Sequence, residues 1–290
     1  MKYLYYPGCS ADGTGRAYEE SLLPVFEALG IEMEELKDWN CCGATAYMAV
    51  DEAKAFALSA RNLALAEDQF AGESEINIVA PCNACYLGLL KAKHYTEDDP
   101  KIGKTIKGAL KAAQLEYKGK AKVRHPLDLL VNDYGIDKIK EHAKKPLKGM
   151  KVAAYYGCQM VRPYSEFDDQ YNPATMDKVL EAVGAEIIDW PHKTRCCGGS
   201  LTWSTEAGLR LNYIILKEAK RRGADVIATC CPLCQFNLEC FQDKIRSKYE
   251  KDLEISIAYF TQILGLGLGI DEKKLALNRL FVPPKVPVTA

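Results

Sequence analysis

Stretches with the hydrophobic pattern of a β-strand alternate along this chain with stretches that have the pattern of an α-helix, and the same order of stretches occurs twice. Runs rich in β-branched and aromatic residues predict strands, and apolar residues at helical spacing predict helices. In the first half the predicted elements are a strand over Lys2–Tyr6, a helix over Tyr18–Leu29, a strand over Ile31–Trp39, a helix over Val50–Phe70, a strand over Ile76–Ala80 and a helix from about Tyr86. In the second half they are Val152–Tyr156, Thr175–Val183, Glu186–Trp190, Thr205–Arg222 and Val226–Thr229.

Local sequence similarities align the two halves. Glu27–Gly30 corresponds to Glu181–Gly184, and each stretch ends a predicted helix at a glycine. Strands that alternate with helices predict parallel sheets covered by helices. We therefore expect an α/β fold made of two pseudo-symmetric halves from an internal duplication, residues 1–148 and 149–290. The expected boundary lies in the lysine-rich stretch His142–Gly149.

Ten of the twelve cysteines form a pattern that occurs once in each half. A lone cysteine after an aromatic strand precedes a Cys-Cys doublet with glycine, and a Cys-x-x-Cys pair follows. The spacing is C-x31-CC-x39-CxxC in the first half and C-x37-CC-x33-CxxC in the second. The first set is Cys9, Cys41, Cys42, Cys82 and Cys85, and the second is Cys158, Cys196, Cys197, Cys231 and Cys234. All lie at predicted strand-to-helix junctions, where ligands gather in such folds, so the sulfurs of each half are expected to converge.

The composition is that of an ordinary globular protein, with 48% apolar and 27% charged residues. A net charge of −1 gives no general attraction to nucleic acid or to an anionic membrane. The start of the sequence shows no secretory pattern, and the longest apolar run, Ile255–Ile270, is interrupted and too short to span a bilayer comfortably. We expect a cytoplasmic protein without a membrane span, in which cysteines are metal ligands or redox groups; a disulfide framework is the alternative.

Four thiolates satisfy either tetrahedral zinc or a cubane [4Fe–4S] cluster, and each half offers five. Zinc cannot use the fifth, which is either structural or a bridge between irons in a more open cluster. The glycines after the doublets, Gly43, Gly198 and Gly199, suit a backbone that passes close to inorganic sulfide. Cys230 and Cys240 fall outside the pattern and are interpreted as buried or spare thiols.

The doubled motif, with Cys41-Cys42-Gly43 and Cys196-Cys197-Gly198, resembles the cysteine-rich CCG-domain proteins, and its two halves together resemble the B-type subunit of heterodisulfide reductase. The resemblance implies that each set of five cysteines binds a non-cubane [4Fe–4S] cluster in which one cysteine bridges. It also implies a substrate, the mixed disulfide of coenzymes M and B, which is reduced to two thiols. The hypothesis that follows is that the two clusters face one cleft and that each delivers one electron.

The chain is not expected to bind its own flavin or NAD. No Rossmann fingerprint or P-loop occurs, and the glycines Gly265, Gly267 and Gly269 follow a helix-like segment with the wrong spacing. The resemblance implies that electrons arrive from the ferredoxin-like iron–sulfur subunit of such a reductase. Behind it would stand the flavin-containing iron–sulfur subunit, with a hydrogenase as an optional further partner.

Because the implied substrate is anionic, basic residues near the cysteines are candidates for binding it. By position these are Lys193 and Arg195, with His192 beside them and Arg162 after Cys158. His125 is the candidate proton donor. For the cations the alternative is an ordinary surface charge, and for His125 a structural, hydrogen-bonded histidine. The tryptophans are interpreted as packing that keeps water from the clusters; they are Trp39, Trp190 and Trp203.

Two other functions remain open at this point. One is an electron-relay CCG subunit of a lactate, glycolate or thiol–fumarate oxidoreductase. The other is a structural zinc or cubane scaffold. The lysine-rich segment Thr96–Lys122 carries an apolar stripe and is expected to be an amphipathic helix, packed on the core or facing a partner.

Overall fold

The fold is built on two four-stranded sheets with the same topology. The computed structural model describes residues 3–44, 46–201 and 205–286. The first sheet has the order β2-β1-β3-β4 and the second the order β6-β5-β7-β8, with every neighbouring pair parallel. The strands are β1 Tyr3–Tyr5, β2 Met33–Glu35, β3 Ile76–Val79, β4 Ala121–Arg124, β5 Lys151–Tyr155, β6 Glu186–Ile187, β7 Val226–Thr229 and β8 Ser256–Tyr259. The predicted α/β fold with an internal duplication is confirmed.

Helices connect the parallel strands, as crossover connections require. The α-helices are α1 Arg16–Ala28, α2 Ala46–Val50, α3 Glu52–Gln69, α4 Asn83–Asp98, α5 Pro100–Ala112, α6 Pro126–Asp128, α7 Ile136–His142, α8 Thr175–Ala182, α9 Thr205–Arg221, α10 Pro232–Cys240, α11 Gln242–Lys248 and α12 Phe260–Gly267. Leu129–Tyr134 is π-helical, and short 3₁₀ turns span Gly199–Leu201, Glu272–Leu275 and Leu277–Arg279.

Two of the edge strands, β2 and β6, are shorter than the sequence predicts. Regular pairing ends at Glu35 in β2 and at Ile187 in β6. Beyond these residues each strand gives way to a loop that runs to its Cys-Cys doublet. The loose apolar alternation of Ile31–Trp39 therefore marks a short strand followed by a shaped loop.

Backbone contacts divide the chain into two compact units that do not follow the midpoint of the sequence. One unit consists of Met1–Ser10 and Glu32–Pro126, and the other of Ala11–Ile31 and Leu127–Ala290. Helix α1 thus belongs to the second unit, where Tyr18 stacks on Tyr259 with ring centroids 4.5 Å apart. In the same unit Ser21 and Thr261 share a 2.6 Å hydrogen bond. The sequence boundary at residue 148 stays a prediction.

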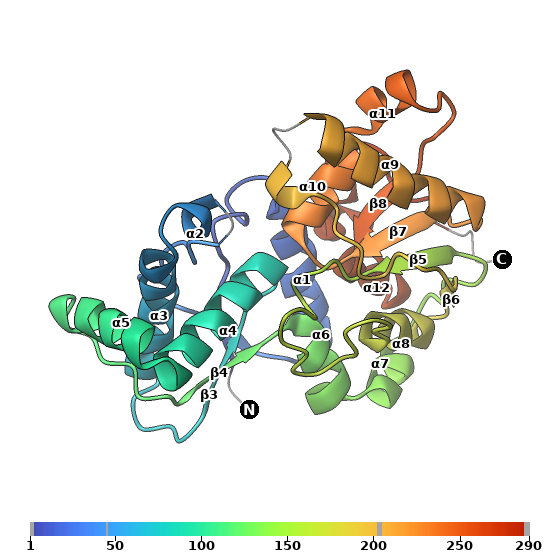
Figure 1. Ribbon diagram of the computed structural model, residues 1–290. Helices are drawn as coiled ribbons and strands as arrows, with labels where there is room; N and C mark the ends of the chain where they lie inside the picture. Colours follow the sequence, from blue (N-terminus) through green and yellow to red (C-terminus); the bar gives the residue numbers. More distant parts are fainter. Residues whose placement is uncertain (1–2, 45, 202–204, 287–290) are drawn as a thin grey trace. The chain divides into compact units, whose positions relative to one another are not determined.

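In each unit helices cover a buried sheet. All residues of β3, β7 and β8 are buried, as expected for parallel strands with helices packed on them. In the first unit α5 packs against α3 and α4 and buries Ile106 and Leu110. In the second unit, α9 and α10 lie on one side of the sheet and α8 and α12 on the other (Figure 1). The core-packed interpretation of the Thr96–Lys122 stripe thus holds over α5.

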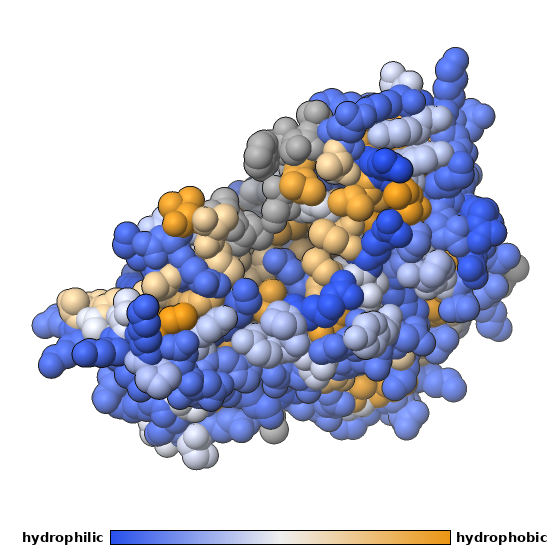
Figure 2. All heavy atoms as spheres, viewed as in Figure 1, coloured by the Kyte–Doolittle hydropathy of each residue, from blue (hydrophilic) through white to orange (hydrophobic). Residues whose placement is uncertain are grey.

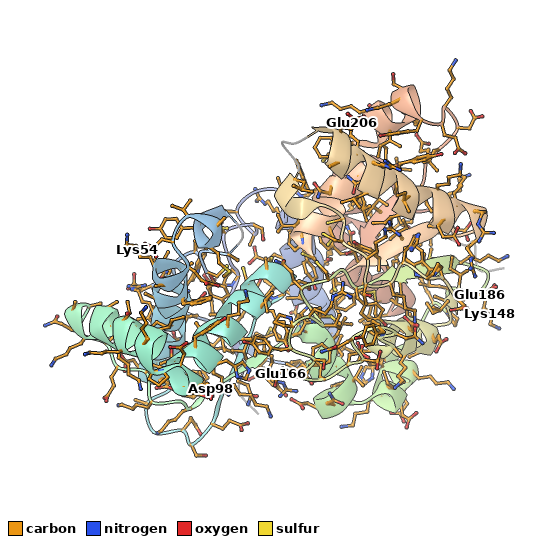
Figure 3. All side chains as sticks on the ribbon, viewed as in Figure 1. Lys54, Asp98, Lys148, Glu166, Glu186 and Glu206 are labelled. Carbon is orange, nitrogen blue, oxygen red and sulfur yellow. The ribbon has the colours of Figure 1, made fainter. Side chains whose placement is uncertain are left out.

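The surface is mainly hydrophilic on the face drawn in Figure 2, with apolar side chains scattered over it. Among described residues the exposed large apolar side chains are Leu23, Tyr47, Val50, Tyr171, Leu201 and Phe281. Charged side chains such as Lys54 and Glu206 point outward from their helices (Figure 3). Within the described ranges, no helix has the length and apolar character needed to cross a membrane.

Candidate functional site

In the first unit the five patterned cysteines come together beyond the carboxyl ends of β1, β2 and β3. Cys9 follows β1, the doublet Cys41-Cys42 follows β2, and Cys82 and Cys85 lie at the start of α4. The Sγ atoms of Cys9 and Cys41 are 3.7 Å apart, and those of Cys42 and Cys85 are 3.4 Å apart. Hydrogen bonding to Cys41 raises the pKa of Cys9, hydrogen bonding to Cys42 raises that of Cys85, and the nearby Cys82 raises both further.

The second unit repeats this arrangement. Cys158 follows β5, Cys196-Cys197 follows β6, and Cys231 and Cys234 lie at the start of α10. The Sγ atoms of Cys197 and Cys234 are 3.5 Å apart, and the N–H of Gly198 donates to Cys196 Sγ at 3.3 Å. All twelve cysteines are free thiols. Among the described residues, no three or more His, Cys, Asp or Glu side chains are arranged to hold a single metal ion.

The crowding of sulfurs makes the cysteines of each set unequal. Hydrogen bonding from Cys42, then from Cys9, lowers the pKa of Cys41 to about 2. Hydrogen bonding from Cys158, assisted by the N–H groups of Gly198 and Gly199, lowers the pKa of Cys196 to about 6. The first cysteine of each doublet is therefore the favoured thiolate. Hydrogen bonding with Cys196 raises the pKa of Cys158, the lone cysteine of the second set, so that Cys158 favours the thiol form.

Two equivalent tyrosines hold the doublet loops. Tyr6 and Tyr155 each lie three residues before the lone cysteine of their half. The hydroxyl of Tyr6 donates to the backbone oxygen of Asn40 at 2.7 Å, and that of Tyr155 donates to the oxygen of Arg195 at 2.5 Å. Both acceptors are the residue immediately before a doublet. Burial, reinforced by the neighbouring cysteines, raises the pKa of both phenols, so they stay protonated donors.

Around these tyrosines the two halves use different supports. In the first unit Arg61 on α3 donates to the Asp38 backbone oxygen at 2.7 Å and to Asn40 Oδ1 at 2.9 Å. The neighbouring Asn62 accepts from Asn40 N at 2.9 Å and donates to Asn40 O at 3.0 Å. Helix α3 thus fixes the loop that leads to the first doublet.

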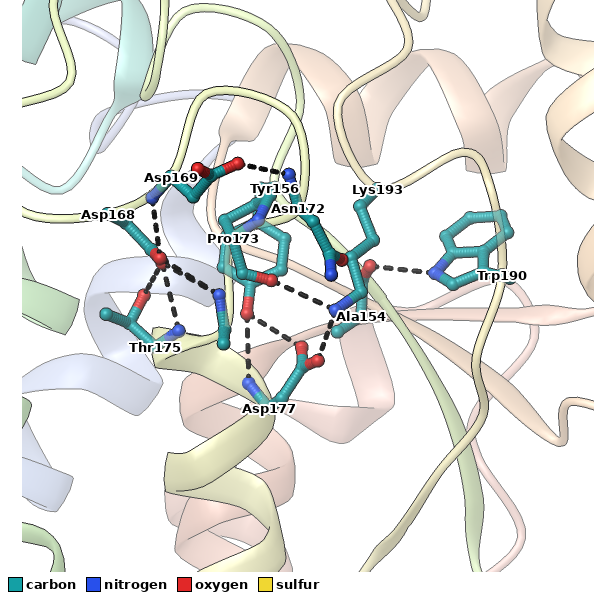
Figure 4. A network of polar contacts seen from close by, with 11 residues as sticks. Ala154, Tyr156, Asp168, Asp169, Asn172, Pro173, Thr175, Asp177, Trp190 and Lys193 are labelled. Carbon is teal, nitrogen blue, oxygen red and sulfur yellow. Dashed lines mark hydrogen bonds and ion pairs between the residues drawn. The ribbon is translucent and has the colours of Figure 1, made fainter.

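In the second unit a buried ion pair fixes the loop that leads to the doublet. Lys193 Nζ forms a short ion pair with Asp177 on α8 and donates to the Pro173 oxygen at 3.0 Å (Figure 4). The hydroxyl of Tyr156 donates to Asp177 Oδ1 at 2.7 Å. The backbone oxygen of Lys193 accepts from Tyr156 N at 2.9 Å and from Gly157 N at 3.1 Å. One residue therefore ties the doublet loop to the loop that carries Cys158.

The start of α8 is fixed by a second carboxylate. Asp168 Oδ2 accepts from Thr175 N at 2.9 Å and from the Thr175 hydroxyl at 2.5 Å, as Figure 4 shows. It also accepts from Ala174 N. These contacts satisfy N–H groups that a helix start leaves without intrahelical partners.

The predicted basic residues lie in different environments. Lys193 is buried in its ion pair, whereas the Arg195 side chain is exposed directly before Cys196. Arg162 donates to the Thr194 oxygen at 2.5 Å, in the same loop. His192 is half-buried, and burial lowers its pKa. His125 is fully buried in the first unit, with its ring 5.6 Å from that of Tyr86. Their roles toward a substrate stay predictions.

The two cysteines outside the pattern are placed apart from the sulfur contacts of the sets. Cys230 is buried, with its Sγ 3.6 Å from the Tyr156 oxygen and 3.8 Å from Met160 Sδ. Cys240 is at the end of α10, where burial raises its pKa to about 11. Trp190 is buried and donates to the Ala154 oxygen at 2.9 Å, while Trp39 is half-buried. Trp203 lies outside the described residues.

Sequence reasoning missed several residues that shape the site. Asp177 and Asn237 belong to helices far along the chain from the doublet loop, and no local motif marks them. Asn237 Nδ2 lies 3.6 Å from Cys197 Sγ and 3.4 Å from Cys197 O. The available signal was a comparison of the halves, because Asn237 and Gly88 both stand three residues after a Cys-x-x-Cys pair.

The cysteine sulfurs of each site, and the N–H groups near them, are the kinds of group that hold an iron–sulfur cluster. Each offers five sulfurs, of which three in each half are buried, and backbone or side-chain N–H groups point at the second set. A glycine also keeps space open, since a Cβ on Gly8 would lie 2.8 Å from Cys85 Sγ.

Comparison with known families agrees with the repeated motif. The family described as cysteine-rich domain, CCG, matches residues 3–89 and 152–239. The two matches cover the three cysteine elements of each half. The chain belongs to this CCG cysteine-rich domain family.

Individual relatives match over nearly the whole chain. A protein from Archaeoglobus profundus, named as similar to the B-type subunit of heterodisulfide reductase, is 32% identical, over 95% of this chain and 93% of its own length. The 8-methylmenaquinol:fumarate reductase membrane anchor subunit of Wolinella succinogenes is 29% identical, over 96% of this chain and 95% of its own length. The resemblance to the B-type subunit of heterodisulfide reductase is thereby confirmed.

A solved structure shares the fold. The crystal structure of a hypothetical protein from Helicobacter pylori aligns with a TM-score of 0.74 and 16% identity, over 99% of this chain. The chain spans about half of that longer protein, 53%. At this identity the match supports the fold alone.

Proposed function

We propose that this chain is the disulfide-reducing subunit of a heterodisulfide reductase-type oxidoreductase, with one [4Fe–4S] cluster in each half. The observation that carries the proposal is the gathering of five cysteine sulfurs in each unit, beyond the carboxyl ends of equivalent strands. Similarity over 95% of the chain to the heterodisulfide reductase-like protein of Archaeoglobus profundus supports a disulfide as the substrate class.

The proposed ligands are the two sets of five. They are Cys9, Cys41, Cys42, Cys82 and Cys85 for one cluster, and Cys158, Cys196, Cys197, Cys231 and Cys234 for the other. Four thiolates suffice for a cubane, so a fifth cysteine would be available to hold a cluster of the proposed non-cubane type. When bound, such clusters supply electrons one at a time. Reduction of a disulfide to two thiols takes two electrons and two protons, which matches one cluster in each half.

The chain's own residues supply position and shielding. Tyr6 and Tyr155 hold the doublet loops through the carbonyl before each doublet. Trp190 packs near Tyr155, with ring centroids 6.1 Å apart. These contacts hold the loops that carry the sulfurs, and the position of the ligands tunes a cluster's potential.

The mixed disulfide of coenzymes M and B is the proposed substrate, and its anionic ends require cations. Arg195 is the strongest candidate, because its exposed guanidinium directly precedes Cys196. The ammonium of Lys193 is already occupied by Asp177, so its proposed role is to position the doublet loop. His125, which is buried beside Tyr86, is the proposed proton donor.

The proposed partners follow from the resemblance to the B-type subunit of heterodisulfide reductase, whose relatives are named as subunits. Electrons would reach the chain from a ferredoxin-like iron–sulfur subunit and a flavin-containing subunit, with a hydrogenase as an optional addition. We propose a cytoplasmic location for this assembly.

A relay function is the second candidate. It is favoured by the similarity to one subunit of the menaquinol:fumarate reductase of Wolinella succinogenes, at 29% identity over 96% of the chain. In that case the same cysteines would pass electrons onward and no disulfide would be cleaved here.

The test uses the chain purified anaerobically with its iron and sulfide. It is supplied with the mixed disulfide and a reduced viologen dye, and both dye oxidation and thiol release are followed. The proposal predicts two thiols for each disulfide consumed, loss of turnover in Cys196→Ser, and unchanged turnover in the control Cys240→Ser. If the chain passed electrons from the dye to a different acceptor and released no thiol from the disulfide, the reductase would be refuted and the relay favoured.

A further inference from the structure

The contacts behind the two doublets differ in a way that bears on the clusters proposed above. In each unit a long helix passes close behind the glycine of the doublet. A Cβ on Gly43 would lie 3.1 Å from Ala55 Cα on α3, and one on Gly198 would lie 3.4 Å from Gly208 Cα on α9. Ala55 and Gly208 are therefore equivalent positions.

One helical turn further on, the equivalent residues are Ser59 and Asn212. Ser59 Oγ donates to the backbone oxygen of Cys42 at 2.6 Å. Asn212 Nδ2 instead donates to the backbone oxygen of Asn237 at 3.0 Å. The longer side chain thus reaches past the doublet to helix α10.

A second pair of equivalent positions also differs between the halves. Gly88 and Asn237 each stand three residues after the last cysteine of their set, one turn into α4 and α10. A Cβ on Gly88 would lie 3.2 Å from Ser59 Oγ and 3.6 Å from Cys42 Cβ. The space beside Gly88 in the first half is therefore tight where the second half carries Asn237.

Asn237 uses this space to donate to a cysteine. It is 1% exposed, and its Nδ2 lies 3.6 Å from Cys197 Sγ and 3.4 Å from Cys197 O. A donor aimed at a thiolate ligand stabilises negative charge on the sulfur. Because a cluster gains negative charge when it is reduced, such a donor favours the reduced form.

We infer that Asn237 tunes the second-half cluster, raising its reduction potential through the side-chain amide at Cys197 Sγ. The corresponding Cys42 faces Gly88, which offers no such donor. The inference rests on the proposed ligation of clusters by both sets. It assigns Asn237 a positioning and tuning role, without contact with the substrate.

The test is a redox titration of the iron–sulfur protein followed by electron paramagnetic resonance. In Asn237→Leu, which keeps the branching and the number of side-chain heavy atoms but removes the donor, one of the two cluster transitions should shift to lower potential while the other stays. Asn237→Gln, which retains an amide donor, should recover part of the shift. The control is Gln242→Leu, which removes a buried amide that pairs with Ile255 in the same unit and touches no patterned cysteine.

Several outcomes would overturn the inference. They are unchanged potentials in Asn237→Leu with both clusters present, an equal shift of both transitions, or the same shift in Gln242→Leu. If Asn237→Leu loses iron, Asn237→Gly, which copies Gly88, takes its place with the same expected shift. Loss of iron in all the Asn237 variants would also overturn it, since Asn237 would then serve assembly. Failure of the proposed clusters is distinct, because the unmodified chain would then hold no pair of clusters. Failure of disulfide reduction alone would show as missing thiol release from the unmodified chain, with both cluster transitions still present.

Discussion

Single glycines decide how closely the backbone of this chain approaches its own cysteines. Gly8 adopts φ +71, a left-handed conformation that disfavours other residues by about 1–2 kcal/mol. The space beside it is also filled, because a Cβ there would lie 2.8 Å from Cys85 Sγ. Conformation and proximity therefore both require glycine at the turn that leads to Cys9.

The substitution Gly8→Ala should remove the first cluster and leave the second. The added methyl displaces Cys85 from the set, so the purified protein is expected to retain about half of its iron, as one of two [4Fe–4S] clusters would be lost. Iron analysis and visible absorbance measure this. Gly13→Ala is the matched control, because no heavy atom lies within 4 Å of a Cβ at that position. Full iron content in Gly8→Ala would contradict the role assigned to Gly8.

At this scale the sequence identified the residues that carry a motif and missed those that do not. The ten cysteines stand at fixed offsets from strands and glycines, so their convergence in each unit was predictable. Asn237 and Asp177 act on loops 40 and 16 residues away, respectively. Their contacts depend on where α10 and α8 pack, which no local pattern specifies.

At the level of elements, the two halves hold the loop before the Cys-Cys doublet with different contacts. In the second unit Lys193 and Asp177 bury a charge pair, with side chains 8% and 14% exposed. Removing one partner of such a pair leaves the other charge uncompensated in a poorly solvated place.

Lys193→Met should therefore lower the free energy of unfolding by about 3 kcal/mol. Denaturant titration measures the change, and Lys193→Met combined with Asp177→Leu should recover much of it. The control is Lys54→Met, because Lys54 is 71% exposed in its pair with Asp51 and projects from α3 in Figure 3. Solvent screens such a surface pair, so this change should leave the free energy of unfolding nearly unaltered. Equal losses in the two single variants would show that the Lys193 pair is not a buried support.

The order and type of elements were predictable, while their partners were not. The hydrophobic pattern predicted the strands and helices in the correct order along the chain, because buried parallel strands and amphipathic helices have distinct patterns. The placement of α1 in the second unit was not foreseen. It depends on Tyr18 and Ser21 meeting Tyr259 and Thr261, which lie far along the chain, 240 residues apart in the case of Ser21 and Thr261.

At the level of the whole molecule, the duplication gives one chain two copies of the same cysteine site. The identical strand orders and the two CCG matches are consistent with that history. The copies have since acquired different surroundings, with Ser59 and Gly88 in one and Asn212 and Asn237 in the other. If each copy holds the proposed cluster, two similar but unequal one-electron sites would suit a reaction that consumes two electrons.

The most direct test of this account is the metal and sulfide content of the whole chain, purified without oxygen. The account predicts about eight iron ions and a comparable amount of acid-labile sulfide per chain, four iron ions for each cluster. Cys82→Ser and Cys231→Ser should each disturb the spectroscopic signature of only one cluster. A chain that instead binds about one zinc ion in each half, with no labile sulfide, would contradict the account.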